Sequence, residues 1–283
     1  MAGGMYRRDA FASGTHVDEK LHAYVGWTSH HGSYADCLPI QSASGDLTLF
    51  FAGEHYAPEG DEERRIARDS RCAPHKAEVL LPLCRDKGDA FFSYLNGFFH
   101  GLILDARNGQ VILFNDRFGM QRLYYHEGPE AFYFASEAKS ILAVRPELRA
   151  FDLKGLGEWM SCGAVLENRS LFRGIDVLPA AARWTWRRDG ALEKRRYFTP
   201  EVWETQPRLG PEEFYSRLRS TFLRRLPAYL ESDGLVGLST TGGLDTRMIL
   251  ANLGAGKSRI HCYSFNGPYR ENLDVSIGRR VAR

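Results

Sequence analysis

Residues 235–254, LVGLSTTGGLDTRMILANLG, place two glycines, an aspartate and several hydroxyl side chains between two apolar segments. Residues 235–238 are typical of a short buried strand, and the apolar spacing after the glycines predicts a helix over 246–253. We expect Gly242 and Gly243 to adopt backbone angles closed to other residues. Free backbone N–H groups at the start of such a helix can bind an anion. Further donors would be the hydroxyl groups of Ser239, Thr240, Thr241 and Thr246. An ordinary strand-to-helix turn with a hydroxyl N-cap is the alternative.

The position of Asp245 indicates which kind of anion would bind at this turn. No Lys follows the glycines at P-loop spacing, and the pattern G-x-G-x-x-G is absent, so neither a P-loop nor a dinucleotide fingerprint is present. A carboxylate beside a bare phosphate is unfavourable, whereas a Mg²⁺ ion between the two is a stable arrangement. The turn therefore predicts a site for Mg²⁺ and a polyphosphate, with Asp245 as the metal ligand.

The six residues TGGLDT, 241–246, resemble the pyrophosphate loop S-G-G-x-D-S of ATP pyrophosphatases, which cleave ATP between its α and β phosphates. Threonine replaces both serines here, which keeps the hydroxyl groups. The resemblance implies that ATP and Mg²⁺ bind at this loop. The implied contacts come from the backbone N–H groups of Gly242, Gly243 and Leu244, from the hydroxyls of Ser239, Thr241 and Thr246, from Leu238 in the preceding strand, and from Phe265 and Asn266 after the next strand.

The composition is that of a globular protein: the 283 residues are 43% hydrophobic and 25% charged. The net charge of +2 gives no reason to expect nucleic acid, and no apolar run approaches the roughly 20 residues that span a membrane. The five cysteines lack C-x-x-C spacing, so neither a disulfide framework nor a zinc site is expected. Because the N-terminus also lacks an apolar signal segment, we expect a cytoplasmic protein.

The predicted strands and helices fall into two parts of the chain, and the loop lies in the second part. Up to about residue 200 the sequence predicts short strands and turns, with a hairpin at Asn108–Gly109. A proline-rich and polar segment, 198–211, predicts the boundary, and a strand–helix–strand unit is expected over 235–267. Because one β-α-β unit cannot cover both faces of a parallel sheet, the sequence favours a fragment over a finished protein with a small appended lobe. Further helices are expected over 76–88, 151–163 and 211–230.

The first half carries a second group of motifs. Residues 115–125, NDRFGMQRLYY, and 134–139, FASEAK, resemble the motif pair D-R-F-G-x-K-P-L-Y-Y and F-A-S-E-x-K-A-L. Residues 95–105, LNGFFHGLILD, match L-x-G-M-F-A-F-A-L-x-D, and residues 171–181, LFRGIDVLPAA, are similar to LF-x-GI-x-x-LPPG. These motifs belong to the asparagine synthetase family, in which a class II glutamine amidotransferase domain precedes a pyrophosphate-loop domain. The resemblance covers about residues 46–283.

The resemblance implies a fold for each part of the chain. Residues 1–200 would form an α+β layered domain, Ntn-hydrolase-like αββα, of the class II glutamine amidotransferase kind. Residues 211–283 would form the N-terminal part of an α/β, Rossmann-like ATP pyrophosphatase domain. Within the first domain we expect Asp116, Arg117 and Glu137 to form a buried ion network that fixes two hairpins. The two adjacent tyrosines of the motif would be core or interface aromatics.

The glutamine site departs from the family pattern. Class II amidotransferases use an N-terminal cysteine as the nucleophile, but this chain begins MAGG, and the first plausible family strand, HAYVGW, places His22 at that position. The Asn of the family's N-G-E-x-Y segment, which supplies an oxyanion donor, is Ala52. The aspartate of its S-D-x-E segment, which grips the substrate ammonium, is Lys76. We therefore predict that the domain is inactive as a glutaminase. The remnants of its site are Gly53 and Glu54.

Taken together, the motifs predict an asparagine synthetase-like, ATP-dependent amide-forming ligase. It would adenylate a carboxylate of a small molecule or peptide, and ammonia or an amine would then attack, with release of AMP and pyrophosphate. The eroded glutamine site favours relatives that use an amine of the substrate, such as β-lactam synthetases and lasso-peptide cyclases. A non-catalytic scaffold is a further alternative. Neither nucleic acid nor a membrane is an expected partner, and a homodimer is left open.

Overall fold

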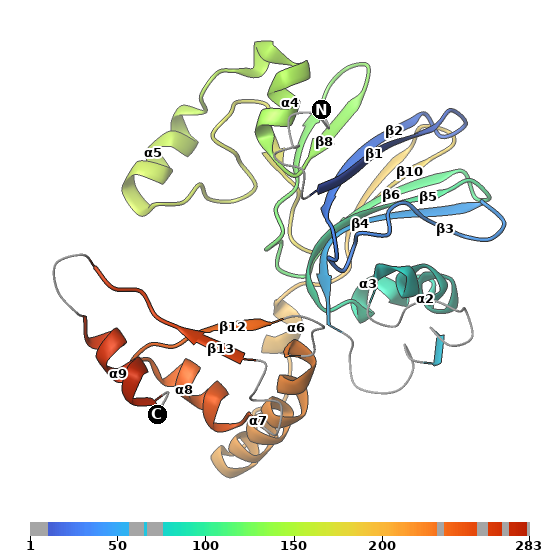
Figure 1. Cartoon of the computed structure of the whole chain (residues 1–283). Coiled ribbons are helices and arrows are strands. Elements are labelled where there is room, and N and C mark those ends of the chain that lie inside the picture. The colour runs from blue at the N-terminus through green and yellow to red at the C-terminus, as the bar shows by residue number, and fades with distance from the viewer. Residues whose placement is uncertain are drawn as a thin grey trace. The chain divides into compact units, whose positions relative to one another are not determined.

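The computed structural model describes residues 11–56, 65–66, 76–230, 235–253, 260–267 and 272–281. The chain divides into two compact units, Met1–Thr205 and Gln206–Arg283 (Figure 1). The strands of the first unit are β1 (Phe11–Asp18), β2 (Ala23–His30), β3 (Ile40–Gln41), β4 (Leu47–His55), β5 (Gly97–Asp105), β6 (Gln110–Asn115), β7 (Tyr124–Glu127), β8 (Phe132–Ala135), β9 (Asp176–Val177), β10 (Ala182–Arg187) and β11 (Leu192–Arg196). Its helices are α2 (Leu80–Lys87), α3 (Ala90–Tyr94), α4 (Ala138–Val144), α5 (Leu153–Cys162) and α6 (Glu201–Glu204), with short 3-10 turns η2 (Ala77–Val79) and η3 (Pro146–Leu148).

A six-stranded sheet in the order β11-β10-β6-β5-β4-β3 is the centre of the first unit. Its central strands are apolar on both faces, because successive side chains point to opposite sides of a strand and both sides are covered. Phe51, Phe99 and Phe114 point to one face and pack with α2 and α3. Phe50 and Leu102 point to the other face, where they pack with β2 and β10.

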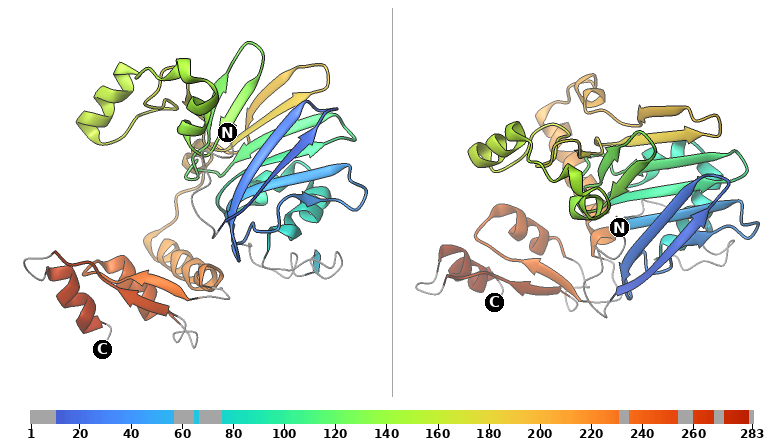
Figure 2. Two further views of the ribbon diagram at one scale, coloured as in Figure 1. Left: turned by 45° about the horizontal axis from the view of Figure 1, so that its top comes forward. Right: turned by 90° about the horizontal axis from the view of Figure 1, so that it is seen from above.

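A second β layer and a further helix complete this unit. Tyr125 of β7 and Phe132 and Phe134 of β8 pack in the cluster that covers the second face of the six-stranded sheet. The hairpin β1–β2 lies on that face too, while α2 and α3 cover the first face (Figure 2). On the far side of β8-β7-β9, Ile141 and Leu142 of α4 pack against Ala135. The order of layers is helix, sheet, sheet, helix, so the expected αββα fold is confirmed.

Turn chemistry agrees with the sequence at the β5–β6 hairpin. Gly109 has a φ of 63°, and Asn108 donates its backbone N–H and its side-chain amide to the Asp105 carboxylate, at 2.9 and 2.7 Å. The Asn-Gly hairpin predicted from the sequence is therefore confirmed.

The expected ion network of Asp116, Arg117 and Glu137 is wrong. Asp116 is fully buried, but its carboxylate accepts hydrogen bonds from backbone N–H groups of the chain that follows it and from the N–H of Phe99. Arg117 donates to the Ser93 carbonyl at 3.0 Å, and Glu137 pairs with a lysine two residues later. A buried carboxylate can be satisfied by backbone donors alone, which residue types do not reveal.

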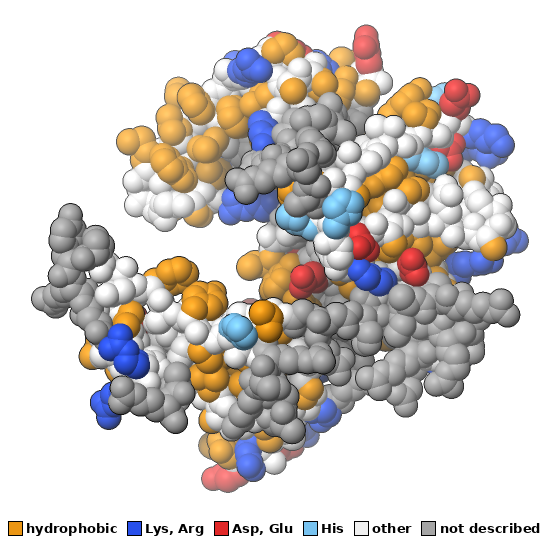
Figure 3. Space-filling view, in the orientation of Figure 1, with side chains coloured by type: hydrophobic (Ala, Val, Ile, Leu, Met, Phe, Trp, Pro, Cys, Tyr) orange, Lys and Arg blue, Asp and Glu red, His pale blue; other side chains and the backbone are white. Residues whose placement is uncertain are grey.

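Most residues of helix α5 are exposed. Asp152 caps its N-terminus by accepting the Gly155 N–H at 2.6 Å, and Gly163 ends it in a left-handed conformation. Figure 3 shows hydrophobic side chains gathered over this part of the molecule. The large apolar residues that stay exposed on α5 are Leu153, Trp159 and Met160.

The second unit consists of α7 (Pro211–Arg225), the 3-10 turn η4 (Leu226–Tyr229), β12 (Val236–Ser239), α8 (Leu244–Ala251), β13 (Ile260–Tyr263) and α9 (Leu273–Val281). β12 and β13 pair in parallel, with Val236 opposite Ile260 and Ser239 opposite Tyr263. The predicted strand–helix–strand order is therefore confirmed. Among the residues that the structure describes, none forms a helix that is long and apolar enough to cross a membrane.

Candidate functional site

The predicted pyrophosphate loop lies at the carboxyl ends of the two parallel strands. β12 ends at Ser239, and the Thr240 N–H then donates to the Tyr263 carbonyl at 2.7 Å, which ties the start of the loop to the end of β13. Gly243 is the N-cap of α8, which begins at Leu244. In open α/β sheets this edge is where ligands bind, so the topology places the loop at the usual position for a site.

Two of the predicted hydroxyl groups contact the backbone of the loop. The Thr241 hydroxyl accepts the N–H of Gly243 at 3.1 Å, and the Thr246 hydroxyl accepts the N–H of Thr241 at 3.4 Å. Gly242 donates its N–H to the Asp274 carboxylate at 2.9 Å. The N–H groups of both glycines are therefore already used inside the protein, and a phosphate would take the place of Asp274 and of the Thr241 hydroxyl.

Asp274 is a site residue that sequence reasoning missed. It lies in the first turn of α9, 32 positions along the chain from Gly242. One turn later, Gly278 approaches the loop so closely that a Cβ there would lie 2.8 Å from the Thr240 carbonyl oxygen. Residues four apart share a helix face, so Asp274 and Gly278 together hold α9 against the loop. The available signal was an acidic residue in the first turn of the helix that follows the second parallel strand.

The reason for the glycine pair differs from the expectation. Neither Gly242 nor Gly243 has a positive φ, and Gly243 is extended at φ −65° and ψ 153°. A Cβ on Gly242 would instead lie 3.0 Å from the Ile277 side chain and 3.1 Å from the Asp274 carboxylate. The expectation that both glycines need angles closed to other residues is wrong, because the constraint at Gly242 is the close approach of α9.

The remaining predicted contacts surround the same strand ends. Asp245 is exposed in the first turn of α8, where the helix dipole favours a negative charge. The ring of Phe265 is 75% exposed, and it packs edge-on against Tyr263. The Asn266 side chain accepts the Asn272 N–H at 3.1 Å, so its carboxamide is held close to the start of α9. Leu238 and Ser239 are partly buried in β12.

No preformed metal cluster accompanies Asp245. Within the described ranges, no group of three or more His, Cys, Asp or Glu side chains could hold a metal ion. Mg²⁺ usually binds through one or two carboxylates, with phosphate oxygens and water completing its shell. The donors present fit an ion that arrives with a polyphosphate, and they do not fit a resident metal held by protein side chains alone.

The residues of the glutamine-site remnant, Gly53 and Glu54, make contacts within the first unit. Gly53 has a φ of 113°, and a Cβ there would lie 2.0 Å from the Phe98 carbonyl oxygen, so the close approach of β4 and β5 requires glycine. Glu54 is exposed and accepts a hydrogen bond from the Tyr56 hydroxyl. Ala52 lies opposite His100 on β5 and supplies no side-chain donor.

Lys76 places a cation where the family has the aspartate that grips the substrate ammonium. Its ammonium donates to the Asp36 carboxylate at 3.0 Å and to the Ser33 carbonyl at 2.8 Å. The hydrogen bond from Lys76, together with one from the Gly32 N–H, holds the pKa of Asp36 below its usual value. Lys76 is neutralised by Asp36, and Lys76 itself offers a substrate ammonium no negative charge.

His22, the residue at the expected position of the catalytic cysteine, lies inside the chain. It has a φ of 51° and sits in the turn between β1 and β2, two strands that pair along their full length. A residue preceded by a paired strand has its backbone nitrogen in a peptide bond. It therefore lacks the free amino group that an N-terminal nucleophile uses.

Comparison with known proteins agrees with this architecture. The family model described as a glutamine amidotransferase domain matches residues 28–198, more than half of the chain. The chain belongs to this glutamine amidotransferase domain family. The match lies in the layered unit and ends before the pyrophosphate-like loop, so it does not bear on that loop.

Several curated proteins that are similar to this chain are longer than it is. Asparagine synthetase [glutamine-hydrolyzing] 1 of Bacillus subtilis is 27% identical over 174 residues, covering 62% of this chain and 27% of the relative. Asparagine synthetase [glutamine-hydrolyzing] 2 of the same organism is 26% identical over 269 residues, covering 88% and 34%. Amidase chyE of Penicillium rubens is 25% identical over 215 residues, covering 75% and 31%. The chain thus spans about a third of the length of these relatives.

Among solved structures, the chain is similar to a glutamine phosphoribosylpyrophosphate amidotransferase from B. subtilis complexed with ADP and GMP. The TM-score is 0.40 and the sequence identity is 15%, over 62% of this chain and 34% of that one.

Proposed function

We propose that this amidotransferase-family chain is part of an ATP-dependent, amide-forming ligase of the asparagine synthetase kind, and that loop 240–246 binds the pyrophosphate part of ATP with Mg²⁺. The observation that carries the proposal is the contact between the Gly242 N–H and the Asp274 carboxylate at 2.9 Å. There a carboxylate oxygen stands where a phosphate oxygen would bind. The domain order, amidotransferase unit first and TGGLDT loop second, supports the same conclusion.

The described residues fit a magnesium polyphosphate. The N–H groups of Gly242, Gly243 and Leu244 would hold phosphate oxygens, and Asp245 would bind the metal. When bound, ATP would supply an adenylyl group to the carboxylate, with pyrophosphate as the leaving group. The proposal also includes a cytoplasmic setting.

The side chains around the loop would orient the nucleotide. The Thr246 hydroxyl accepts the Thr241 N–H and so holds the loop in shape, and the O–H groups of Thr246 and Thr241 remain available as donors. The exposed ring of Phe265 offers an apolar surface for a base. Asn266, held by Asn272, would offer an amide contact to the nucleoside.

The nitrogen source that best fits the first unit is ammonia or an amine of the substrate. Ala52 supplies no oxyanion donor, and Lys76 is already paired with Asp36. The two asparagine synthetases named above are glutamine-hydrolysing, so the proposal is that this chain has kept their fold and lost the hydrolysis of glutamine. The carboxylate substrate would be a small molecule or a peptide.

Binding of magnesium pyrophosphate to the purified chain tests the site directly. Isothermal titration calorimetry would compare pyrophosphate with and without Mg²⁺, on wild type and on Asp245→Asn. We expect binding to require Mg²⁺ and Asp245→Asn to weaken it about tenfold or more, because the amide removes a charge from the metal ligand. Thermal stability should stay unchanged, since Asn and Asp cap helix starts about equally well.

The matched control is Glu212→Gln, which removes an exposed carboxylate from the first turn of α7 and should leave binding as in wild type. Equal affinity with and without Mg²⁺, or Asp245→Asn binding as wild type does, would mean that the loop only starts its own helix.

A further inference from the structure

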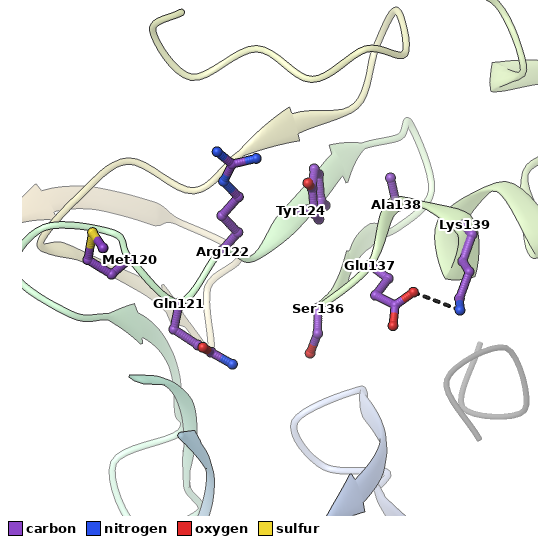
Figure 4. A pocket seen from close by; sticks show the side chains of 8 residues that line it. All are labelled: Met120, Gln121, Arg122, Tyr124, Ser136, Glu137, Ala138 and Lys139. Atoms are coloured by element: carbon purple, nitrogen blue, oxygen red, sulfur yellow. Dashed lines mark ion pairs between the residues drawn. The ribbon is translucent and has the colours of Figure 1, made fainter. Parts of the chain in front are cut away.

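A pocket of about 490 Å³ opens in the first unit, and Gly53 and Glu54 of the glutamine-site remnant are not among the residues that line it. It is formed by the chain that follows β6, by β7, and by the turn from β8 into α4. Figure 4 shows Gln121 and Arg122 on one side, Glu137 and Lys139 on the other, and Tyr124 and Ser136 between them. The lining residues lie within the matched amidotransferase domain, and the proposed ligase chemistry does not use them.

The wall of the pocket contains a serine bound to a buried histidine. The Ser136 hydroxyl lies 3.2 Å from Nε2 of His100, whose side chain is buried behind it in β5. Burial lowers the pKa of His100 to about 4, although the backbone of Gln121 and the Asp116 carboxylate oppose this effect. His100 is therefore neutral near pH 7, and it orients the Ser136 hydroxyl without adding a charge to the pocket.

The charges around the pocket leave one positive charge without a counterpart. Glu137 and Lys139 pair with each other at 2.7 Å. Arg122 is exposed, and within the described part of the chain its guanidinium makes neither an ion pair nor a hydrogen bond. An arginine fork matches the geometry of a carboxylate and can donate two parallel hydrogen bonds to it. The free charge and its geometry both fit a ligand with a single carboxylate.

The polar groups of this pocket are departures from the family motifs. In the motif L-x-G-M-F-A-F-A-L-x-D the position of His100 is an alanine. In D-R-F-G-x-K-P-L-Y-Y the positions of Gln121 and Arg122 are a lysine and a proline. Residues from two separate motifs have therefore changed around one pocket, and the changes add a buried imidazole, an amide and a guanidinium. The changes also remove the lysine of the motif, so the cation moves from position 121 to position 122.

We propose that this pocket is a binding site for a small molecule with one carboxylate group. Arg122 binds the carboxylate, and Met120 and Tyr124 are the apolar surface for the middle of the molecule. The Ser136 hydroxyl and the Gln121 amide, which point to the other side of the pocket in Figure 4, are polar contacts for its far end. The lining residues all belong to the first unit, so the site includes no residue of loop 240–246.

The test is a titration of the ¹⁵N-labelled chain with butyrate, benzoate and L-glutamine, each compared with its primary amide, followed by amide chemical shifts. We expect at least one carboxylate to shift the resonances of residues 120–124 and 136–139, and its amide to bind about tenfold more weakly. Arg122→Gln should weaken the carboxylate about tenfold or more. Ser136→Ala should weaken it by a smaller factor.

Arg149→Gln, which removes another exposed arginine of the same unit outside the pocket, is the matched control and should bind as wild type does. Thermal unfolding of Arg122→Gln should be unchanged, because that side chain is exposed. The proposal is overturned if no carboxylate binds, if the amides bind equally well, or if Arg122→Gln retains the affinity of wild type. Because the titration contains no nucleotide, its failure leaves the proposed ligase function untouched, and the reverse also holds.

Discussion

His100 couples the stability of the first unit to pH. Its pKa falls from 6.5 to about 4 in the folded protein because burial disfavours the charged ring. The unfolded chain therefore binds the proton more readily, and stability that is present above pH 6.5 is lost as the pH falls towards 4. The full loss is about 3 kcal/mol, since one pKa unit corresponds to ~1.36 kcal/mol.

The variant that tests this dependence is His100→Ala, which restores the residue of the family motif. Urea unfolding across that pH range should show a steep loss of stability in wild type and a shallower one in the variant. Asp36 and Asp89, whose pKa values are lowered, destabilise both proteins on acidification, so the difference between the curves isolates His100. Parallel curves would show that His100 is protonated in the folded protein at the same pH as in the unfolded chain.

Helix α5 contains two glycines for which the structure predicts opposite effects of the same substitution. A Cβ on Gly155 would lie 2.9 Å from the Ser170 carbonyl oxygen, whereas a Cβ on Gly157 would meet nothing within 4 Å. We expect Gly155→Ala to destabilise the protein by about 1–3 kcal/mol, because backbone must move. Gly157→Ala should stabilise it by ~0.5–1 kcal/mol, because alanine is the better helix former.

Urea unfolding of the two variants beside wild type measures both effects. Both variants make the same Gly-to-Ala change in the same helix, so the change in helix propensity is equal and each variant is the control for the other. A stabilising Gly155→Ala would mean that the space between α5 and the backbone at Ser170 accepts a methyl group.

At the scale of elements, features that depend on neighbouring residues were predicted from the sequence, whereas contacts between distant residues were not. Apolar spacing predicted the strand, helix and strand around loop 240–246, and the Asn-Gly pair predicted the β5–β6 hairpin, because both signals lie within a few neighbouring residues. The contact of Asp274 with Gly242 joins residues 32 positions apart, so an acidic residue in the first turn of α9 does not by itself identify its partner. The same limit explains Asp116, whose partners are backbone groups that carry no side-chain signature.

At the scale of the whole molecule, the family match and the glutamine-site residues lead to opposite expectations about the hydrolysis of glutamine. The amidotransferase family model covers residues 28–198, and the fold of that unit is complete in its layers. The substitutions lie at the positions that touch glutamine in the family, Ala52 and Lys76, while Gly53 is retained where the close approach of β4 and β5 requires it. We therefore expect the unit to have kept its fold and lost the hydrolysis of glutamine.

The last prediction is therefore that the purified chain releases no ammonia from L-glutamine above the buffer blank. Loss of one oxyanion donor, as at Ala52, costs about 100- to 1000-fold in rate. Lys76 opposes the substrate ammonium, and the position of His22 between two paired strands removes the free amino group that would activate a nucleophile. A coupled ammonia assay measures the release, with glutamate formation as the second readout. Ammonia production that is abolished by a cysteine-trapping glutamine analogue would show instead that a cysteine elsewhere in the fold has taken over the nucleophile's role.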